Sequence, residues 1–571
     1  MNTRYWTEVN RTLCAKIISE LHYEELLSPQ KTALGWQLDG ATQQWRFHAN
    51  TTLWGMLEVD PKSICRADGA KVEAVALVLD LRQSLGMTDI NLANFLEELQ
   101  QTLYSDMVRL EQLENLTATD LVNMGEAQRQ RYLDAHPKAV ANKGRLGWGA
   151  DDLHRYAPES GNAFALRWLA VRKTCCQAGV AQGLDYQTLL TQVLGQAEYQ
   201  QLVAKLSGSV DDFHLLAVHP WQHQRFLSSQ FATLFASGDL VDLGEAGPQW
   251  LAQQSIRTLS ASDPGVPFDA KTALTILNTS CYRGIPGKFI VQGPQLSAWL
   301  AKLAASDATL KRQGLYVQQE VAGFFCEQPY QTQIAKGPYR YHEQLGCIWR
   351  QRAESVIGDH CRPITMAALM QTDAEGMPLI QALVERSGIS PAQWLTQMFE
   401  HVVVPLYHLM CQYGVGLVAH GQNITLVLEN DAPVGCTIKD FHGDLRLVDQ
   451  EFVELESLDD DIRHTLTKLP AEHLVHDLLT GHFVTVLRFI SPKVTGMGVS
   501  ELSFYRLLRQ VIEDYQQQHP ELRHRFKQFD LLSPTIAKVC VNRVRFKIGY
   551  GDSDERPLPD IGEPIANPLM M

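Results

Sequence analysis

The sequence lacks the segments that mark membrane and secreted proteins. Nowhere do about 18 apolar residues follow one another, so no transmembrane helix is expected. Charged residues interrupt positions 1–27 every few residues, and no apolar core is followed by a small-residue cleavage site, which argues against a signal peptide. We therefore expect a cytoplasmic protein with no membrane partner.

Several catalytic and cofactor motifs are also missing. There is no G-x-x-x-x-G-K-[ST] loop, no H-E-x-x-H and no G-x-S-x-G. Residues 414–419, GVGLVA, match a dinucleotide-binding fingerprint, but a helix is expected before them and a strand after them, the reverse of a Rossmann turn. The 11 cysteines include no C-x-x-C pair, so no zinc or iron–sulfur site is predicted and the thiols are expected to be reduced.

Length and charge limit the remaining possibilities. The chain has 571 residues, too many for one hydrophobic core, so more than one domain is expected. Its 45% hydrophobic and 20% charged residues are typical of a globular protein. A formal net charge of −14 argues against nucleic acid as a partner, but local basic clusters can still bind an anion.

Hydrophobic periodicity predicts a mixed α+β fold. Helical spacing extends over residues 6–30, 85–135, 391–414 and 470–530. Strand patterns rich in Thr, Ile and Leu fall between about 160 and 330, and Ile424 to Leu428 read as a buried strand.

The first candidate site is a group of cations and hydroxyls within about thirty residues. Its members are Ser255, Arg257, Thr258, Lys271, Thr279, Ser280 and Arg283. In a strand, Ser255 and Arg257 would share one face. Guanidinium, ammonium and hydroxyl groups together suit an oxyanion, although a solvated strand face explains the pattern equally well.

The second candidate site combines HGQN, at 420–423, with KDFHGD, at 439–444. A two-strand hairpin could place Asn423 beside Asp440, and these oxygen ligands suit Mg²⁺ on a nucleotide. If these residues have only structural roles, His420 is a core histidine and Asp444 is a turn residue after Gly443.

The third candidate site is the Gly-rich and basic loop at residues 135–159. His136, Lys143 and Arg145 could bind the carboxylates of a substrate. A solvated loop would have the same composition.

Six ordered motifs resemble one family. HPKxxxNKGRxGWG, HPWQ, SxRT, KTxLTxxNTSCYRGIPG, AHGQNITL and KDFxGDxRL are similar to motifs of the IucA/IucC family, which builds siderophores without a nonribosomal peptide template. The resemblance covers nearly the whole chain. The segments CYRGIPG, WLAQQSIRTL and GHFVTVLRFISP further resemble the aerobactin synthase branch.

The resemblance implies a cupped hand of three parts with a loosely kinase-like palm. We expect a helical thumb over residues 1–125, mixed fingers over 126–325 and a palm over 326–571. ATP would lie between fingers and palm, and the enzyme would be a homodimer. The implied ATP-binding positions are Ser255, Arg257, Thr258, Lys271, Thr279, Ser280, Arg283, His420, Asn423 and Asp440.

The implied reaction uses ATP and Mg²⁺ to form an acyl-adenylate and then an amide. Arg257, Lys271 and Arg283 would stabilise charge, His420 would steady the phosphorus or accept a proton, and Asp440 with Asn423 would meet the metal. The implied substrates are the citryl monoamide of N6-acetyl-N6-hydroxylysine and a second hydroxylysine unit.

Other activities remain open from the sequence. The same chemistry could join succinyl-hydroxydiamine units into a dihydroxamate macrocycle. A phosphotransferase and a reductive ferric-siderophore protein are the alternatives of other classes.

Two positions depart from the family pattern. Val418 stands where some members carry an acid, so we expect more of the metal binding to fall on Asp440. Ala139 replaces a second histidine found in citrate-activating members, which favours a substituted carboxylate over free citrate.

Overall fold

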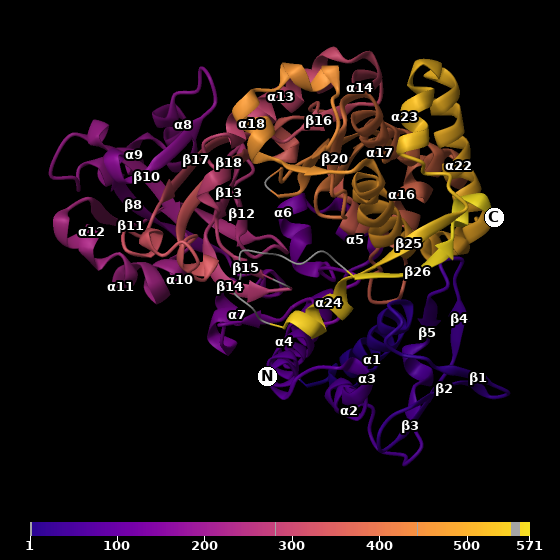
Figure 1. Ribbon diagram of the computed structural model, residues 1–571. Coiled ribbons are helices and arrows are strands. Elements are labelled where there is room, and N and C mark those ends of the chain that lie inside the picture. The colour runs from indigo at the N-terminus through magenta and orange to yellow at the C-terminus, as the bar shows by residue number, and fades with distance from the viewer. Residues whose placement is uncertain (1–2, 280, 442, 550–559) are drawn as a thin grey trace.

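The computed structural model describes residues 3–279, 281–441, 443–549 and 560–571. Helices and sheets alternate along the chain, which confirms the mixed α+β class. Figure 1 shows the large sheet on one side of the molecule, the C-terminal helices on the other, and the N-terminal region below them. Among the described residues, no helix is both long and apolar enough to cross a membrane.

The N-terminal region packs helices against a small sheet. Helices α1 (Trp6–Tyr23) and α4 (Asp89–Leu113) enclose a core that includes Ile17 and Leu99. Helix α1 ends before the expected residue 30 because Glu25 has a φ of 63°, a left-handed conformation that an α-helix does not continue. The small sheet has the order β1 (Gln30–Thr32), β2 (Gly35–Asp39), β3 (Gln44–Phe47), β6 (Cys65–Arg66).

An eight-stranded antiparallel sheet forms the second region. Its order is β10 (Phe213–Val218), β8 (Phe164–Arg172), β11 (Leu240–Ala252), β12 (Thr258–Ala261), β13 (Phe268–Thr272), β18 (Leu345–Gln351), β17 (Glu320–Cys326), β9 (Gln177–Val180). Strand β13 is buried along its whole length although it carries Asp269 and Lys271. Buried charges need partners, and these two residues lead to the candidate site.

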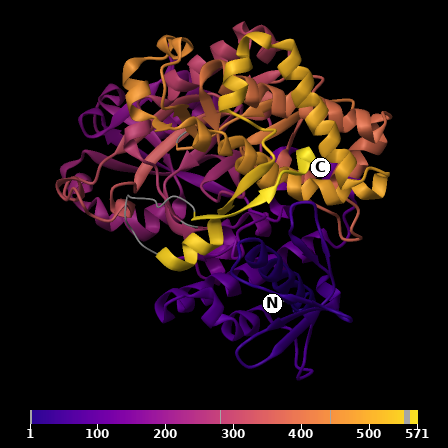
Figure 2. The same ribbon diagram turned by 45° about the vertical axis from the view of Figure 1, so that its right-hand side comes forward.

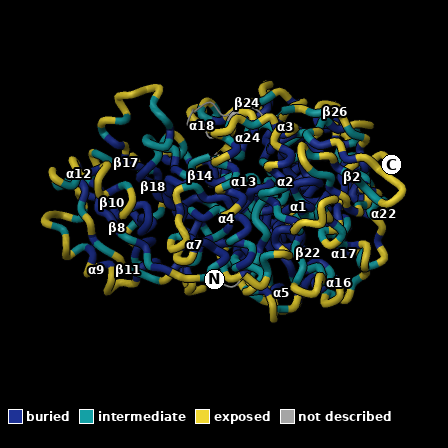
Figure 3. The backbone as a smooth tube through the Cα atoms, turned by 90° about the horizontal axis from the view of Figure 1, so that it is seen from below, coloured by how far each residue is buried: buried dark blue, intermediate teal, exposed yellow. Residues whose placement is uncertain are grey.

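A three-stranded sheet connects two predicted site loops. Its order is β15 (Cys281–Arg283), β14 (Leu274–Asn278), β7 (Arg145–Leu146). Asn278 pairs with Arg145, so the basic loop lies directly beside the NTSCYRG segment. Strands β14 and β18 are buried along almost their whole length, and Figure 3 labels both within the interior of the view from below.

The third region is built on helix α17 (Pro391–Tyr413). As predicted, this helix ends at Gly414, whose φ of 64° is left-handed. The helix packs against a sheet of order β16 (Leu315–Val317), β22 (Ala432–Ile438), β21 (Ile424–Glu429), β19 (Arg362–Thr365). A second sheet has the order β20 (Val415–Leu417), β23 (Leu445–Val448), β24 (Thr467–Leu469).

Further helices cover these sheets. They are α2 (Ala74–Asp80), α5 (Ala118–Asn123), α6 (Glu126–Arg129), α7 (Ala150–Tyr156), α8 (Tyr186–Leu194), α9 (Gln196–Val203), α13 (Gly293–Ser306), α16 (Leu379–Ser387), α20 (His476–Leu478), α22 (Glu501–Gln518) and α23 (Arg523–Gln528). Between α20 and α22 lies a π-helical segment, η12 (Leu479–Leu487).

The C-terminal segment returns to the N-terminal region. Strands β25 (Thr535–Cys540) and β26 (Asp560–Ala566) pair, and helix α24 (Val541–Ile548) follows β25. The Glu24 carboxylate accepts backbone hydrogen bonds from Val541 and Arg543 at 3.0 and 2.9 Å. Figure 2 shows these yellow elements against the indigo N-terminal part.

The expected joins near residues 125 and 325 stay a prediction. Strand β18, which lies after residue 325, belongs to the eight-stranded sheet, whereas β16, which lies before it, belongs to the α17 region. Strands of the two sheets therefore alternate along the chain around residue 325.

Candidate functional site

Asp440 lies at the centre of an ion network that joins two regions. Its Oδ1 atom is 2.5 Å from Nζ of Lys271 on β13 and 2.9 Å from Nη1 of Arg350 on β18. Arg350 also donates to Asp269 Oδ2 at 2.9 Å, directly across the strand pair. Burial opposes a charge on Asp440, but Lys271 and Arg350 outweigh it and hold the pKa of this carboxyl well below its usual range.

Two further guanidinium groups, those of Arg257 and Arg283, lie close enough for their charges to interact. Arg283 donates to Thr279 Oγ1 at 2.6 Å and to Asn278 Oδ1 at 3.3 Å, and Arg257 donates to the carbonyl of Gly284. Burial and the neighbouring Arg283 lower the pKa of Arg257. Among the described residues, neither guanidinium has a carboxylate within ion-pair distance. Two neighbouring guanidinium groups of this kind suit the binding of an anion.

The segment before β12 differs from the prediction. Ser255 and Arg257 do not share a strand face, because they lie in a turn whose central residue, Ile256, has a φ of 58°. Thr258 begins the strand and pairs with Lys271, as a strand residue should. The turn directs Arg257 toward Gly284 rather than along the sheet. Ser280 lies outside the described residues.

His420 has a defined tautomer in the turn before β21. The backbone N–H of Gln422 donates to His420 Nδ1 at 3.2 Å, so the proton of the neutral ring is on Nε2. That Nε2 atom is 4.0 Å from Asp444 Oδ2. Burial lowers the pKa of His420, which keeps the ring neutral near pH 7. His420 is therefore a hydrogen-bond donor on the side that faces Asp444.

The predicted hairpin is present, but its side chains pair differently. Ile424 lies opposite Ile438, and the Lys439 N–H donates to the Asn423 carbonyl at 3.2 Å. The Asn423 side chain, however, donates to Asp444 Oδ2 at 3.0 Å and not to Asp440. Asp444 therefore contacts two residues of the second candidate site, Asn423 and His420, in addition to any role in the turn.

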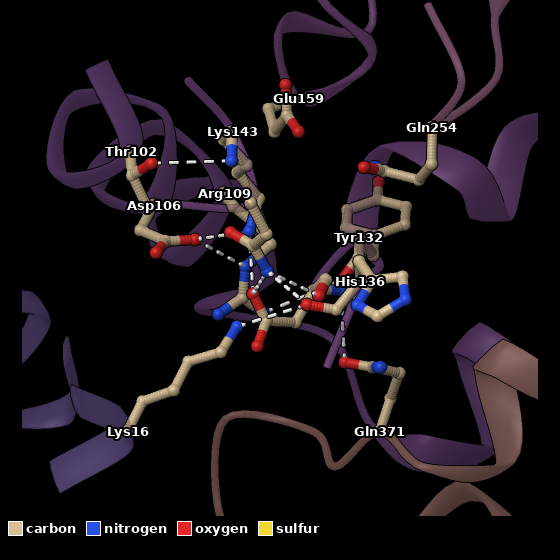
Figure 4. Close-up of polar contacts among 12 residues, drawn as sticks. Lys16, Thr102, Asp106, Arg109, Tyr132, His136, Lys143, Glu159, Gln254 and Gln371 are labelled. Atoms are coloured by element: carbon tan, nitrogen blue, oxygen red, sulfur yellow. Dashed lines mark hydrogen bonds and ion pairs between the residues drawn. The ribbon is translucent and has the colours of Figure 1, made fainter. Parts of the chain in front are cut away.

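The basic loop is held by buried ion pairs. Lys143 has no exposed side-chain surface, and its Nζ atom lies 2.8 Å from Asp106 Oδ1 and 2.6 Å from Asp134 Oδ1. Figure 4 shows Lys143 together with Asp106 and Arg109. Arg145 forms two hydrogen bonds with Glu159, at 2.8 and 2.9 Å, and both side chains are 1% exposed. These contacts account for both cations within the loop. Their role as substrate contacts stays a prediction.

His136 is the loop residue whose charge interacts with the second candidate site. Burial lowers its pKa to about 3, and the charge of His420 contributes in the same direction. Its carbonyl accepts hydrogen bonds from Lys16 Nζ at 3.2 Å and Asn142 Nδ2 at 3.1 Å. His136, His420, Arg283 and Asp440, one or more from each predicted site, therefore lie within range of one another's charges.

The chain is similar to siderophore synthetases over its full length. A model described as the IucA / IucC family matches residues 126–371. The aerobactin synthase of Escherichia coli is 43% identical, and the alignment covers 100% of this chain and 99% of that protein. The chain belongs to the IucA/IucC family. The aerobactin synthase of Vibrio mimicus is 41% identical over 99% of this chain and 97% of its own length.

A solved structure agrees with the IucA/IucC assignment. The aerobactin synthetase IucC from a hypervirulent pathotype of Klebsiella pneumoniae matches with a TM-score of 0.90 and 40% identity, covering 100% of this chain and 99% of that chain. Both the family and the fold class predicted from the six motifs are confirmed.

A second family model matches the C-terminal half of this IucA/IucC member. It is described as a ferric iron reductase FhuF-like transporter and covers residues 392–553. Within the part of the chain that the structure describes, no group of three or more His, Cys, Asp or Glu side chains could hold a metal ion. The full-length relatives are synthases, so the family is an enzyme family that joins substrates into siderophores.

Two residues of this IucA/IucC member's candidate site, Arg350 and Lys16, were missed from the sequence, and a third, Asp444, was given only a turn role. Arg350, Asp444 and Lys16 each contact a predicted site residue from a distant segment. Arg350 could have been recognised from the sequence, because a charged residue within the apolar strand LGCIWRQ needs a buried partner. Lys16 could not, since one lysine on an amphipathic helix is usually solvated.

Proposed function

We propose that this chain is an ATP-dependent siderophore synthetase of the aerobactin type. It adenylates a carboxylate of the citryl monoamide of N6-acetyl-N6-hydroxylysine, releases pyrophosphate, and joins the acyl carbon to the amine of a second N6-acetyl-N6-hydroxylysine. The observation that carries the proposal is the pair Arg257 and Arg283, two neighbouring cations that form no ion pair among the described residues, beside the Lys271–Asp440–Arg350 network. Their place in a family whose full-length relatives are aerobactin synthases supports the substrate class.

The two guanidinium groups bind the anions that must meet. Adenylation brings a carboxylate to the α-phosphate, and cations reduce the repulsion and stabilise the charge of the transition state. Arg283 is held by Thr279 and Asn278, while its Nε atom is buried with no partner among the described residues. A group positioned in this way needs no reorganisation when the anions bind.

Lys271 and His420 have distinct roles in the proposed reaction. Lys271 is held by Asp440 and supplies charge to the phosphates from a fixed place on β13. His420 donates through Nε2–H to a phosphoryl oxygen, because its Nδ1 atom accepts from Gln422 and its lowered pKa keeps it neutral. We therefore favour stabilisation of the phosphorus over acceptance of a proton. Ser255, Thr258 and Thr279 add hydrogen bonds that fix the geometry.

The oxygen donors near Asn423 fit Mg²⁺. Carboxylate and amide oxygens are the ligands that this hard cation prefers, and Asp444 with Asn423 supplies both types beside His420. Asp440 is already neutralised by two cations, so we place the metal nearer Asp444 than the sequence suggested. When bound, Mg²⁺ lowers the charge of the triphosphate and of the leaving pyrophosphate.

The second step needs a positioned amine rather than a covalent enzyme intermediate. No nucleophile motif is present, and an enclosed site that orients the amine provides the rate increase. We propose that His136 contacts the carboxylate substrate, since its charge interacts with those of His420 and Arg283. Ala139, in place of a second histidine, leaves room for a monoamide. We also propose a homodimer, as in the family pattern.

A substrate panel tests this function. The purified enzyme is given ATP, Mg²⁺ and either citryl–hydroxylysine monoamide with N6-acetyl-N6-hydroxylysine, succinyl-hydroxyputrescine or succinyl-hydroxycadaverine, and products are read by mass. We expect the citryl diamide with AMP and pyrophosphate. A macrocycle from a succinyl substrate would replace the substrate assignment, and ADP would indicate a phosphotransferase.

A further inference from the structure

One helical segment holds both backbone groups of the residue before His420. The Ala419 N–H donates to the Asp477 carbonyl at 3.2 Å, and the Ala419 carbonyl accepts from His482 Nδ1 at 2.9 Å. Asp477 and His482 come from α20 and from the π-helical segment η12 that follows it. A π-helical turn is rare and frequently marks a functional site. Here it supports the turn that carries His420.

The chemistry of His482 is unusual for a core residue. A carbonyl can only accept, so Nδ1 of His482 carries the proton and Nε2 is a bare acceptor. The side chain has no exposed surface, and within the described part of the chain Nε2 has no hydrogen-bond partner. Burial lowers the pKa of His482 to about 4, so the ring is neutral. A leucine would fill this place without an unsatisfied nitrogen, which makes the bond to Ala419 the reason for histidine.

The turn is in close contact with backbone on both sides. A Cβ atom added to Gly481 would lie 3.0 Å from the Ala419 nitrogen, and one added to Gly421 would lie 3.0 Å from the Ala367 nitrogen. The Ala367 N–H donates to the Gly421 carbonyl at 2.9 Å. Among the described residues, the His420 ring accepts a hydrogen bond only from Gln422, two residues away. The direction of the ring is therefore set by the backbone of the turn.

We propose that His482 is a positioning residue for His420, acting through its hydrogen bond to the Ala419 carbonyl. This inference rests on the proposed function, in which His420 donates to a phosphoryl oxygen. Loss of the bond leaves the buried carbonyl unsatisfied and lets the turn shift. A misplacement of about 1 Å at a reacting centre can lower the rate by about 10²-fold.

The decisive comparison is between His482→Asn and His482→Leu. Asparagine places an N–H where histidine has Nδ1–H, whereas leucine has no donor. In substrate-dependent ATP–pyrophosphate exchange, we expect the leucine variant to lose about 10- to 100-fold in kcat with the KM for ATP changed less than about twofold. The asparagine variant should retain most of the rate. His476→Leu is the matched control, because His476 bonds Thr480 on the same helix and not the turn.

Coupling and hydrogen exchange separate positioning from general stability. In a His420→Ala background, His482→Leu should cause no further loss in rate. Peptides covering residues 418–423 should exchange amide hydrogens faster in the leucine variant than in the wild type, but not in the asparagine variant. A wild-type kcat in His482→Leu, an equal loss in the His420→Ala background, or unchanged exchange at the turn would overturn the inference. If the wild type shows no pyrophosphate exchange, the proposed function fails, while hydrogen exchange still decides whether His482 holds the turn.

Discussion

Variants of the buried ion pair between Arg145 and Glu159 can show whether the basic loop binds substrate or only supports the site. Both side chains are 1% exposed and are joined by two hydrogen bonds. Arg145→Met removes the cation and leaves the carboxylate buried without a charge partner. Breaking such a pair costs about 3–5 kcal/mol of unfolding free energy. We expect that loss in urea unfolding of the purified protein.

The double variant tests whether the loss of stability comes from the unpaired Glu159 carboxylate. In Arg145→Met with Glu159→Leu, no charge is left unpaired, and replacing a buried ion pair by apolar side chains is often neutral or stabilising. We therefore expect most of the lost stability to return. Arg167→Met is the control, because Arg167 and Asp242 are 29% and 31% exposed, and breaking such a surface pair costs about 1 kcal/mol or less.

The same variants test the predicted substrate contact. If Arg145 only supports the loop, the stable double variant should keep the KM for the citryl substrate within about threefold of the wild type. A rise of more than about tenfold at restored stability would show that Arg145 contacts substrate. A double variant no more stable than Arg145→Met would refute the reasoning from the ion pair.

Three further predictions concern single side chains. Arg283→Ala should abolish pyrophosphate exchange while circular dichroism and the melting temperature stay near wild type; exchange at the wild-type rate would contradict its role. Asp444→Asn should raise the Mg²⁺ concentration needed for half-maximal exchange, whereas a change confined to the KM for the carboxylate would place the metal elsewhere. Burial lowers the pKa of His219 to about 3. Between about pH 6.5 and pH 3, a proton therefore binds to this side chain only in the unfolded state. Over that range the free energy of unfolding falls by about 1.4 kcal/mol for each pH unit by which the pH is lowered. His219→Asn, which keeps the N-cap acceptor for Trp221, should reduce the slope of unfolding free energy between pH 6 and 4.5 by that amount in urea titrations; an unchanged slope would contradict the assignment.

The sequence could predict elements whose signal is local. Helix α17 ends at Gly414 because glycine adopts the left-handed cap, and β21 begins at Ile424 because five consecutive residues are apolar or β-branched. The three candidate loops were found for a related reason. Clustered cations and amides in polar, Gly-rich segments indicate a site wherever they fall in the chain.

The sequence could not predict which acid each cation would meet. Lys143 and Lys271 look alike in sequence, yet Lys143 is enclosed by Asp106 and Asp134, and Lys271 meets Asp440 from another region. These pairings depend on contacts over long sequence separation, which no local pattern encodes. The strand assumed for Ser255 and Arg257 failed for a different reason, because Ile256 adopts a left-handed conformation that β-branched residues rarely take.

The position of Val418 now has a different consequence from the one the sequence suggested. Without an acid at 418, Asp440 seemed the remaining metal ligand, but two cations within 2.9 Å leave its carboxylate little further negative charge to offer. Asp444 accepts from Asn423, and the described residues give it no lysine or arginine partner. The backbone carbonyl of Asp444 also accepts a hydrogen bond from the Val418 N–H at 2.9 Å. Asp444 therefore lies directly beside the position where some family members carry an acid. In the proposed metal site, Asp444 would supply the acid that position 418 lacks, while Asp440 pairs with Lys271 and Arg350 across the two regions.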